Sequence, residues 1–204
     1  LCSEPLFKTL HNLISAILSG CDKDNVTAFI KSVYIDCDER DKNIFINYVL
    51  KYGIDRGRFL QPFNLSDEQD DIACAEKIRN IFVSYYNMLY RQCRLKEYTR
   101  CARNILQKFK MTDYGVLVQS GYMDEAAYRN QSMQKLLKLL DEMDQFATDE
   151  IIPLKLFGEM LYLGAQSQKL SIIPVSVYAV NCGGIDMARF YSAKSIYITA
   201  AAEG

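Results

Sequence analysis

Residues 72–109, IACAEKIRNIFVSYYNMLYRQCRLKEYTRCARNILQKF, decide the fold, because two helical patterns meet in them at a short joint. In each half, apolar residues recur at steps of three and four and so share one helical face. The first face holds Ala75, Ile78, Phe82, Tyr85 and Leu89, and the second Leu95, Tyr98, Ala102, Ile105 and Phe109. Each face must be buried, and the nearest apolar surface is the other helix. The stretch therefore predicts an antiparallel helix pair.

The same periodicity predicts helices before this pair. Pro5 suits the first position of a first helix, which Gly20 ends. A second helix can be capped by Asp22 or Asp24, and the charged cluster 36–42 marks its end. A third helix follows the cluster.

That third helix ends at Gly53, which suits a left-handed cap. Residues 53–65 have no steady helical period, yet they are too apolar for a free linker. We expect an N-terminal helical segment at 1–53, an ordered connection at 54–65 and a helical-repeat-like segment at 66–204, together one continuous domain. The chain begins at Leu1 and ends in an Ala-rich segment, and we expect a fragment of a longer protein.

Ser66 begins the first helix of the pair and has the sequence signature of a capping box. Further helices are expected at 112–118 and 124–146. Thr148 and Asp149 should cap the next, strongly apolar helix, with Pro153 in its first turn, and we expect it to be the most buried one. Residues 171–180, SIIPVSVYAV, fit a strand or a helix; the helix is favoured, and 187–198 would form the last one.

A similar sequence pattern recurs at 89–106, 116–128 and 177–198. It predicts a helix that ends in a small residue, a short joint, and a second helix with an early Ala. Cys93, Gly121 and Gly183 stand at the small-residue position, and Ala126 and Ala188 near the later Ala. This resembles the tetratricopeptide repeat. The resemblance implies stacked helix pairs with a concave surface for peptides or partner subunits. The fold class is all-α, with an irregular α-solenoid and a helical bundle both open.

Composition and motifs exclude several kinds of site. The chain has 24 Lys and Arg against 25 Asp and Glu, so its net charge predicts no polyanion partner. Seven Cys lack metal-ligand spacing, and His11 is the only histidine. No phosphate-binding glycine motif occurs. We expect no catalytic residue, no metal and no cofactor, and therefore no enzyme.

Apolar runs are too short for a membrane span, which predicts a protein of the cytoplasm or nucleus without a membrane partner. The sequence leaves the oligomeric state open.

Cationic side chains gather between residues 91 and 110, where only Glu97 opposes them. The predicted partner-binding residues are Arg91, Arg94, Lys96, Arg100, Arg103 and Lys110. This basic face can be an ordinary solvated surface, a surface for an acidic or phosphorylated protein segment, or a surface for RNA whose bases stack on nearby Tyr rings. We expect a non-catalytic protein–protein interaction or scaffold module of an intracellular assembly, with an RNA-binding helical repeat as the alternative.

Overall fold

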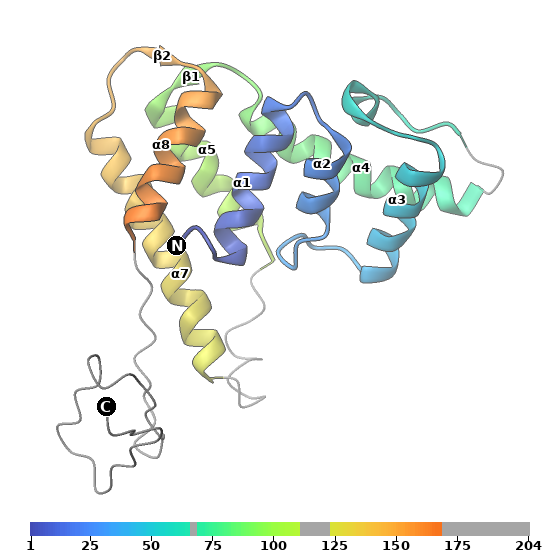
Figure 1. The fold of residues 1–204 in the computed structure, drawn as a ribbon, viewed down its shortest axis with the longest axis horizontal. Helices are drawn as coiled ribbons and strands as arrows, with labels where there is room; N and C mark the ends of the chain where they lie inside the picture. Colours follow the sequence, from blue (N-terminus) through green and yellow to red (C-terminus); the bar gives the residue numbers. More distant parts are fainter. Residues whose placement is uncertain (66–68, 111–122, 169–204) are drawn as a thin grey trace, which may run out of the picture. The chain divides into compact units, whose positions relative to one another are not determined.

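The computed structural model describes residues 1–65, 69–110 and 123–168, which belong to one compact unit (Figure 1). Its elements in chain order are α1 (Pro5–Leu18), α2 (Lys23–Ile30), α3 (Glu39–Lys51), the 3-10 helix η1 (Arg56–Leu60), α4 (Gln69–Leu89), β1 (Cys93–Arg94), α5 (Leu95–Lys108), α7 (Met123–Gln145), β2 (Ile151–Ile152) and α8 (Leu154–Ser167). The two strands hold only two residues each. The predicted all-α class is confirmed.

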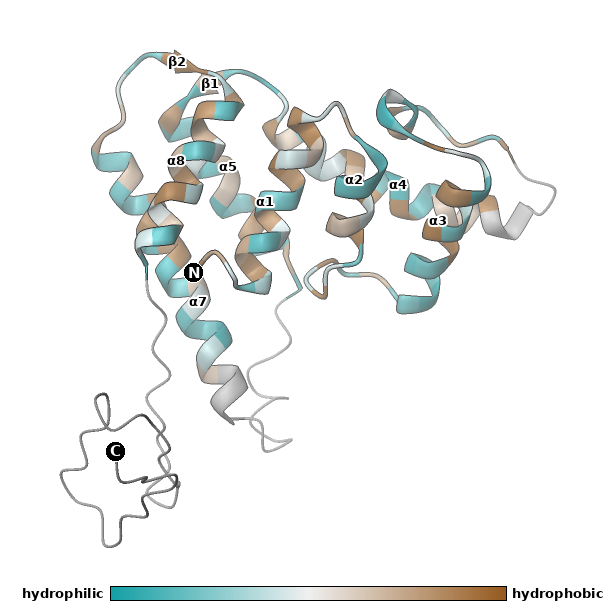
Figure 2. Ribbon diagram, viewed as in Figure 1, coloured by the Kyte–Doolittle hydropathy of each residue, from teal (hydrophilic) through white to brown (hydrophobic). Residues whose placement is uncertain are grey.

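Both apolar stripes of residues 72–109 are buried, as predicted. They do not lie mainly against each other, however, because α4 packs chiefly on α3 and α5 chiefly on α7. Phe82 of α4 illustrates the packing, since its ring meets the edges of Phe29 from α2 and Phe59 from η1. In Figure 2 hydrophobic and hydrophilic residues alternate along the helices, as amphipathic helices require.

The first and last described helices touch. Helix α1 contacts α7 and α8, and α1 and α8 lie side by side in Figure 1. Of the two architectures left open by the sequence, this closure favours a bundle, because the units of a solenoid contact only their neighbours. The tetratricopeptide resemblance stays a prediction, since Gly121 and Gly183 lie outside the described residues.

The N-terminal helix boundaries follow the predicted signals at three points. Pro5 begins α1, and Gly20 and Gly53 take positive φ angles of 72° and 57° after α1 and α3. Asp22 is the residue that caps α2, accepting a hydrogen bond of 2.9 Å from the Asn25 backbone N–H.

The prediction that the cluster 36–42 ends the second helix is wrong. Helix α2 already ends at Ile30, and Glu39 begins α3. The acidic residues of the cluster suit the first turn of α3, where the helix dipole favours negative charge. Lys42 is nearly fully buried, because its ammonium group reaches back to the Ser32 carbonyl at 2.9 Å and to Glu39 at 2.7 Å.

Residues 54–65 pack on α4. The ring of Phe59 is fully buried, and Phe63 is almost so. Arg79 of α4 donates to the Phe59 carbonyl at 3.4 Å, and Glu76 accepts from the Phe63 backbone N–H at 2.9 Å. These contacts hold the connection against α4, while the division of the chain around it stays a prediction.

The prediction that Thr148 and Asp149 cap the next helix is wrong. Residues 151–152 are extended and pair with β1, so α8 begins only at Leu154, with Pro153 as its N-cap at φ −72°. Helix α8 is also not the most buried helix, because four of its 14 residues are buried, against seven of the 14 residues of α1. The long helix expected at 124–146 is confirmed as α7.

Four predicted features lie outside the described residues: the Ser66 cap, the helix at 112–118, and the segments 171–180 and 187–198. Within the part of the chain that the structure describes, no helix is long and apolar enough to cross a bilayer.

Candidate functional site

A two-strand clip fixes the joint between α4 and α5. β1 and β2 are antiparallel, with Cys93 opposite Ile152 and Arg94 opposite Ile151. Beneath them lies Tyr98, whose hydroxyl donates to the Arg91 carbonyl at 2.9 Å and lies 3.4 Å from the Ile152 carbonyl. Burial raises the pKa of Tyr98 to about 12, so the hydroxyl keeps its proton and remains a donor at neutral pH.

The joint carries a short stack of planar groups. The rings of Tyr86 and Tyr90 are nearly parallel, with an interplanar angle of 10° and centroids 5.4 Å apart. The Arg91 guanidinium carbon lies 5.3 Å from the Tyr90 ring centroid, and its Nε donates to the Tyr90 hydroxyl at 3.0 Å. Tyr90 is 43% exposed, and Arg91 is exposed as well. The stack therefore presents an aromatic ring and a planar cation to solvent.

Three of the six predicted partner-binding residues are engaged by the fold. Arg103 lies half-buried and pairs with Asp141 at 2.7 Å and Asp144 at 2.6 Å, both on α7. Lys110 pairs with Asp36 at 2.9 Å. Arg94 donates through Nε to the Asp149 carbonyl at 3.1 Å, next to the clip.

The other three predicted residues are Arg91, Lys96 and Arg100, and all are exposed. Lys96 and Arg100 lie one turn apart on α5 and make no ion pair with any residue in 1–65, 69–110 or 123–168. The predicted basic face thus divides into cations that have a partner in the fold and exposed cations without a carboxylate partner in the described residues.

Tyr90 belongs with the second group, although the sequence-based site omits it. The missed signal is its position: Tyr90 directly follows Leu89, the last residue of the α4 stripe, and so falls off the buried face. A large aromatic residue outside the stripe is a candidate for an exposed contact.

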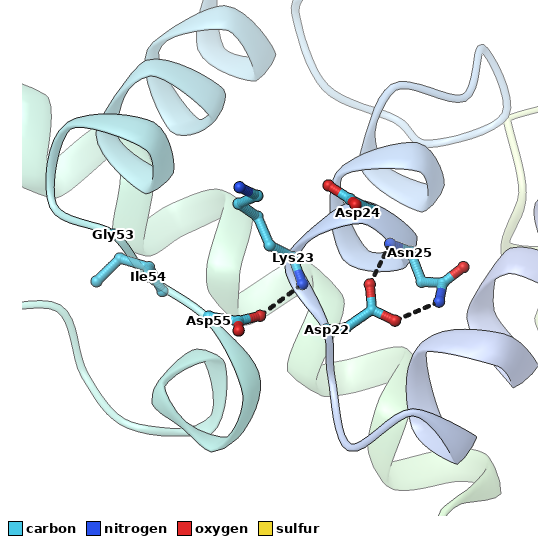
Figure 3. A pocket seen from close by; sticks show the side chains of 7 residues that line it. All are labelled: Asp22, Lys23, Asp24, Asn25, Gly53, Ile54 and Asp55. Atoms are coloured by element: carbon cyan, nitrogen blue, oxygen red, sulfur yellow. Dashed lines mark hydrogen bonds between the residues drawn. The ribbon is translucent and has the colours of Figure 1, made fainter.

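An open groove of about 460 Å³ lies at the start of α2, lined by Asp22, Lys23, Asp24, Asn25, Gly53, Ile54 and Asp55 (Figure 3). Two of its three carboxylates have structural roles. Asp55 accepts from the Lys23 backbone N–H at 2.8 Å, and Asp22 caps the same helix from the other side. The hydrogen bond from the Asn25 backbone holds the pKa of Asp22 below its ordinary value. The groove is explained by helix capping.

Metal-ligating and nucleophilic groups do not converge in the described ranges, where no cluster of three or more His, Cys, Asp or Glu could hold a metal ion. His11 packs against the rings of Phe7 and Tyr162, which also contact each other, and burial lowers the pKa of His11. Burial raises the pKa of the Cys21 thiol to about 11, so this thiol is not a ready nucleophile.

No family model matches the chain. Curated proteins similar to it are each named as a subunit of an ATP-dependent helicase/deoxyribonuclease. The protein from Alkaliphilus metalliredigens is 21% identical over 228 residues, which cover 99% of this chain and 20% of that protein. The protein from Clostridioides difficile is 26% identical over 198 residues, 86% of this chain and 17% of that protein.

A shorter match to the Bacillus subtilis protein of the same name is 31% identical over 84 residues, 41% of this chain and 7% of that protein. The chain spans about a fifth of the length of the curated relatives that match nearly all of it.

These relatives correct the functional prediction. The prediction of a non-catalytic scaffold or adaptor module of the tetratricopeptide type is wrong. The alternative prediction of an RNA-binding helical repeat is wrong as well, because the similar proteins are named as part of a helicase and deoxyribonuclease. The error arose because amphipathic helix pairs are common to many folds and carry no chemistry of their own. The similar proteins are named as enzyme subunits.

Proposed function

We propose that this chain is a helical segment of a protein like these ATP-dependent helicase/deoxyribonuclease subunits, and that it serves such an enzyme's work on DNA. The observation that carries the proposal is a match over 99% of the chain to proteins of that name. The all-α architecture agrees with a structural segment within a larger enzyme.

The segment's own share of the reaction is limited by its sequence. None of its 204 residues forms a GxxxxGK[ST] loop, which holds the phosphates of ATP in many ATP-driven motors. ATP hydrolysis would therefore be supplied from outside this segment. Because the relatives are named as subunits, we expect another component of the same enzyme as a protein partner.

The test uses the native protein. An antibody against this chain would be used to precipitate it from a native lysate, and release of soluble nucleotides from labelled linear duplex DNA would be measured with and without ATP. We expect DNA breakdown that depends on ATP. A precipitate made with pre-immune serum is the control. If the specific precipitate degrades no DNA, or degrades it equally without ATP, the proposal is wrong.

A further inference from the structure

We propose that the exposed side chains of the α4–α5 joint and α5 bind single-stranded DNA. The strand surface, as we call it, consists of the exposed residues Tyr90, Arg91, Lys96 and Arg100, together with the half-buried Tyr86 of α4, on which Tyr90 stacks. The choice of DNA as the polymer rests on the proposed function, whereas the residues are chosen for their exposure and for the contacts among Tyr86, Tyr90 and Arg91.

The stack supplies a platform for bases. Every base has a flat π-face, and bases stack on aromatic rings and on guanidinium planes without needing a particular sequence. Tyr90 is held parallel to Tyr86, and Arg91 is held on Tyr90 by the hydrogen bond of 3.0 Å from its Nε. An unstacked base can extend this series by one more layer. A duplex cannot, because its bases are already stacked on one another.

The cations supply contacts for phosphates. Lys96 and Arg100 face solvent one helical turn apart, without a carboxylate partner in the described residues. Arg103, one turn further along α5, is instead neutralised by Asp141 and Asp144. The open positive charge therefore lies toward the start of α5, the end that adjoins the stack.

The clip holds this surface in place before any ligand arrives. Tyr98 donates to the carbonyl of Arg91 itself, and Arg94 is tied to the Asp149 carbonyl across the clip. Side chains on a fixed backbone lose less conformational freedom on binding, so more of the interaction energy appears as affinity. An acidic peptide could pair with the same cations, but it would gain nothing from an ordered stack of rings. For this reason the geometry favours a nucleic acid strand.

Two variants of the full chain separate stacking from charge. Binding to a fluorescently labelled oligothymidylate would be measured by anisotropy between about 50 and 200 mM salt. Tyr90→Leu removes the middle ring of the series and keeps its apolar bulk, so we expect affinity to fall by about 5-fold or more, with an unchanged salt slope. The double variant Lys96→Ala/Arg100→Ala should make the slope of log affinity against log salt shallower by about 1.4, because each lost phosphate contact contributes about 0.7.

The matched control is Lys138→Ala/Lys155→Ala, which removes two exposed lysines of α7 and α8 that make only long pairs of 3.8 and 3.9 Å within their own helices. Far-ultraviolet circular dichroism would establish that each variant is folded. Binding equal to that of the unchanged chain in the Tyr90→Leu variant overturns the proposal. The proposal is also overturned if the slope of log affinity against log salt becomes equally shallow in the control double variant. Tighter binding of a polyuridylate or polyglutamate competitor than of the oligothymidylate would overturn it as well.

The two proposals can fail separately. Strand binding is measured on this chain without ATP, whereas the proposed function is measured as ATP-dependent DNA breakdown in a native precipitate. A chain that fails to bind the strand can still belong to a complex that degrades DNA with ATP. A chain that binds the strand can likewise give a precipitate without such activity.

Discussion

Arg79 is only 6% exposed, yet its charge is fully matched. Its guanidinium donates to both oxygens of the Glu76 carboxylate, with the Nε bond at 2.7 Å, and lies 5.8 Å from the Phe63 ring centroid. Glu76 also accepts from the Phe63 backbone N–H. One ion pair thus ties the connection at 54–65 to α4, and a buried charge of this kind is costly to leave without its partner.

The Glu76 carboxylate should make stability depend on pH. Hydrogen bonds from Arg79 are the largest cause that lowers its pKa below the ordinary 4.5. Because the folded-state pKa lies below the unfolded one, the stabilisation is present above pH 4.5 and is lost as the pH falls through the lowered value. We expect the free energy of unfolding, measured in denaturant from about pH 6 to about pH 3, to decline most steeply in that acid range.

The control for this prediction is Glu76→Gln, which cannot titrate. It should be less stable than the unchanged chain at pH 6 and should lose less on acidification. An acid decline of the same size in both proteins would place its origin in other carboxylates.

At the residue scale, the sequence identified the cations of the basic face. It could not show which of them form ion pairs and which are exposed without one. Arg103 meets Asp141 and Asp144 only because α5 packs on α7, and these carboxylates lie 38 and 41 residues further along the chain. Neither periodicity nor local charge shows such a pairing. In the fold the two acids hold Arg103.

At the element scale, local signals were sufficient where a boundary depends on nearby residues. Pro5, Asp22 and Gly53 act within one turn of their helices, and each does what its chemistry predicts. The start of α8 depends instead on β2 pairing with β1, which is distant in sequence. A strand of two residues has no readable alternation, so its existence follows only from its partner.

Two glycines of α8 show how closely the helices approach. A Cβ added at Gly164 would lie 2.5 Å from Leu139 Cδ1 and 3.4 Å from its Cγ, and Leu139 is itself buried against the core. A Cβ added at Gly158 would lie 3.1 Å from Ile14 Cγ2 of α1. The space beside Gly164 is therefore tighter than the space beside Gly158.

We expect Gly164→Ala to destabilise the protein and Gly158→Ala to change its stability little. Alanine gains about 1 kcal/mol of helix propensity at either position. Overpacking costs about 1 to 3 kcal/mol where the neighbour cannot move, as at Leu139. Denaturant midpoints of the two variants would check this. Equal stabilisation by both substitutions would mean that Leu139 yields freely.

At the scale of the whole molecule, the helices share one core. Buried side chains from every described helix form a single cluster, and α1 joins the start of the chain to α7 and α8. Such closure couples residues 1–53 with residues 69–110 and 123–168, because unfolding either part would expose the apolar surface of the other.

The described helices should consequently unfold in one transition. Ile30 of α2 and Ile105 of α5 are both fully buried, on opposite sides of the connection at 54–65. Ile30→Val and Ile105→Val should each lower the stability of that same transition by about 1 kcal/mol. Circular dichroism in a denaturant series would follow it. Two separate steps, each moved by only one of the substitutions, would show independent parts.

The clip between β1 and β2 also sets an order in time. At the clip, the Tyr98 hydroxyl contacts the carbonyl of Ile152, which lies 54 residues later in the chain. A ribosome adds roughly 5 to 20 residues per second, so about 3 to 11 s pass between the synthesis of the two partners. During this interval the contact of Tyr98 with Ile152 cannot form. The joint between α4 and α5 therefore reaches its final form only after β2 has emerged, well after the N-terminal helices are free to fold.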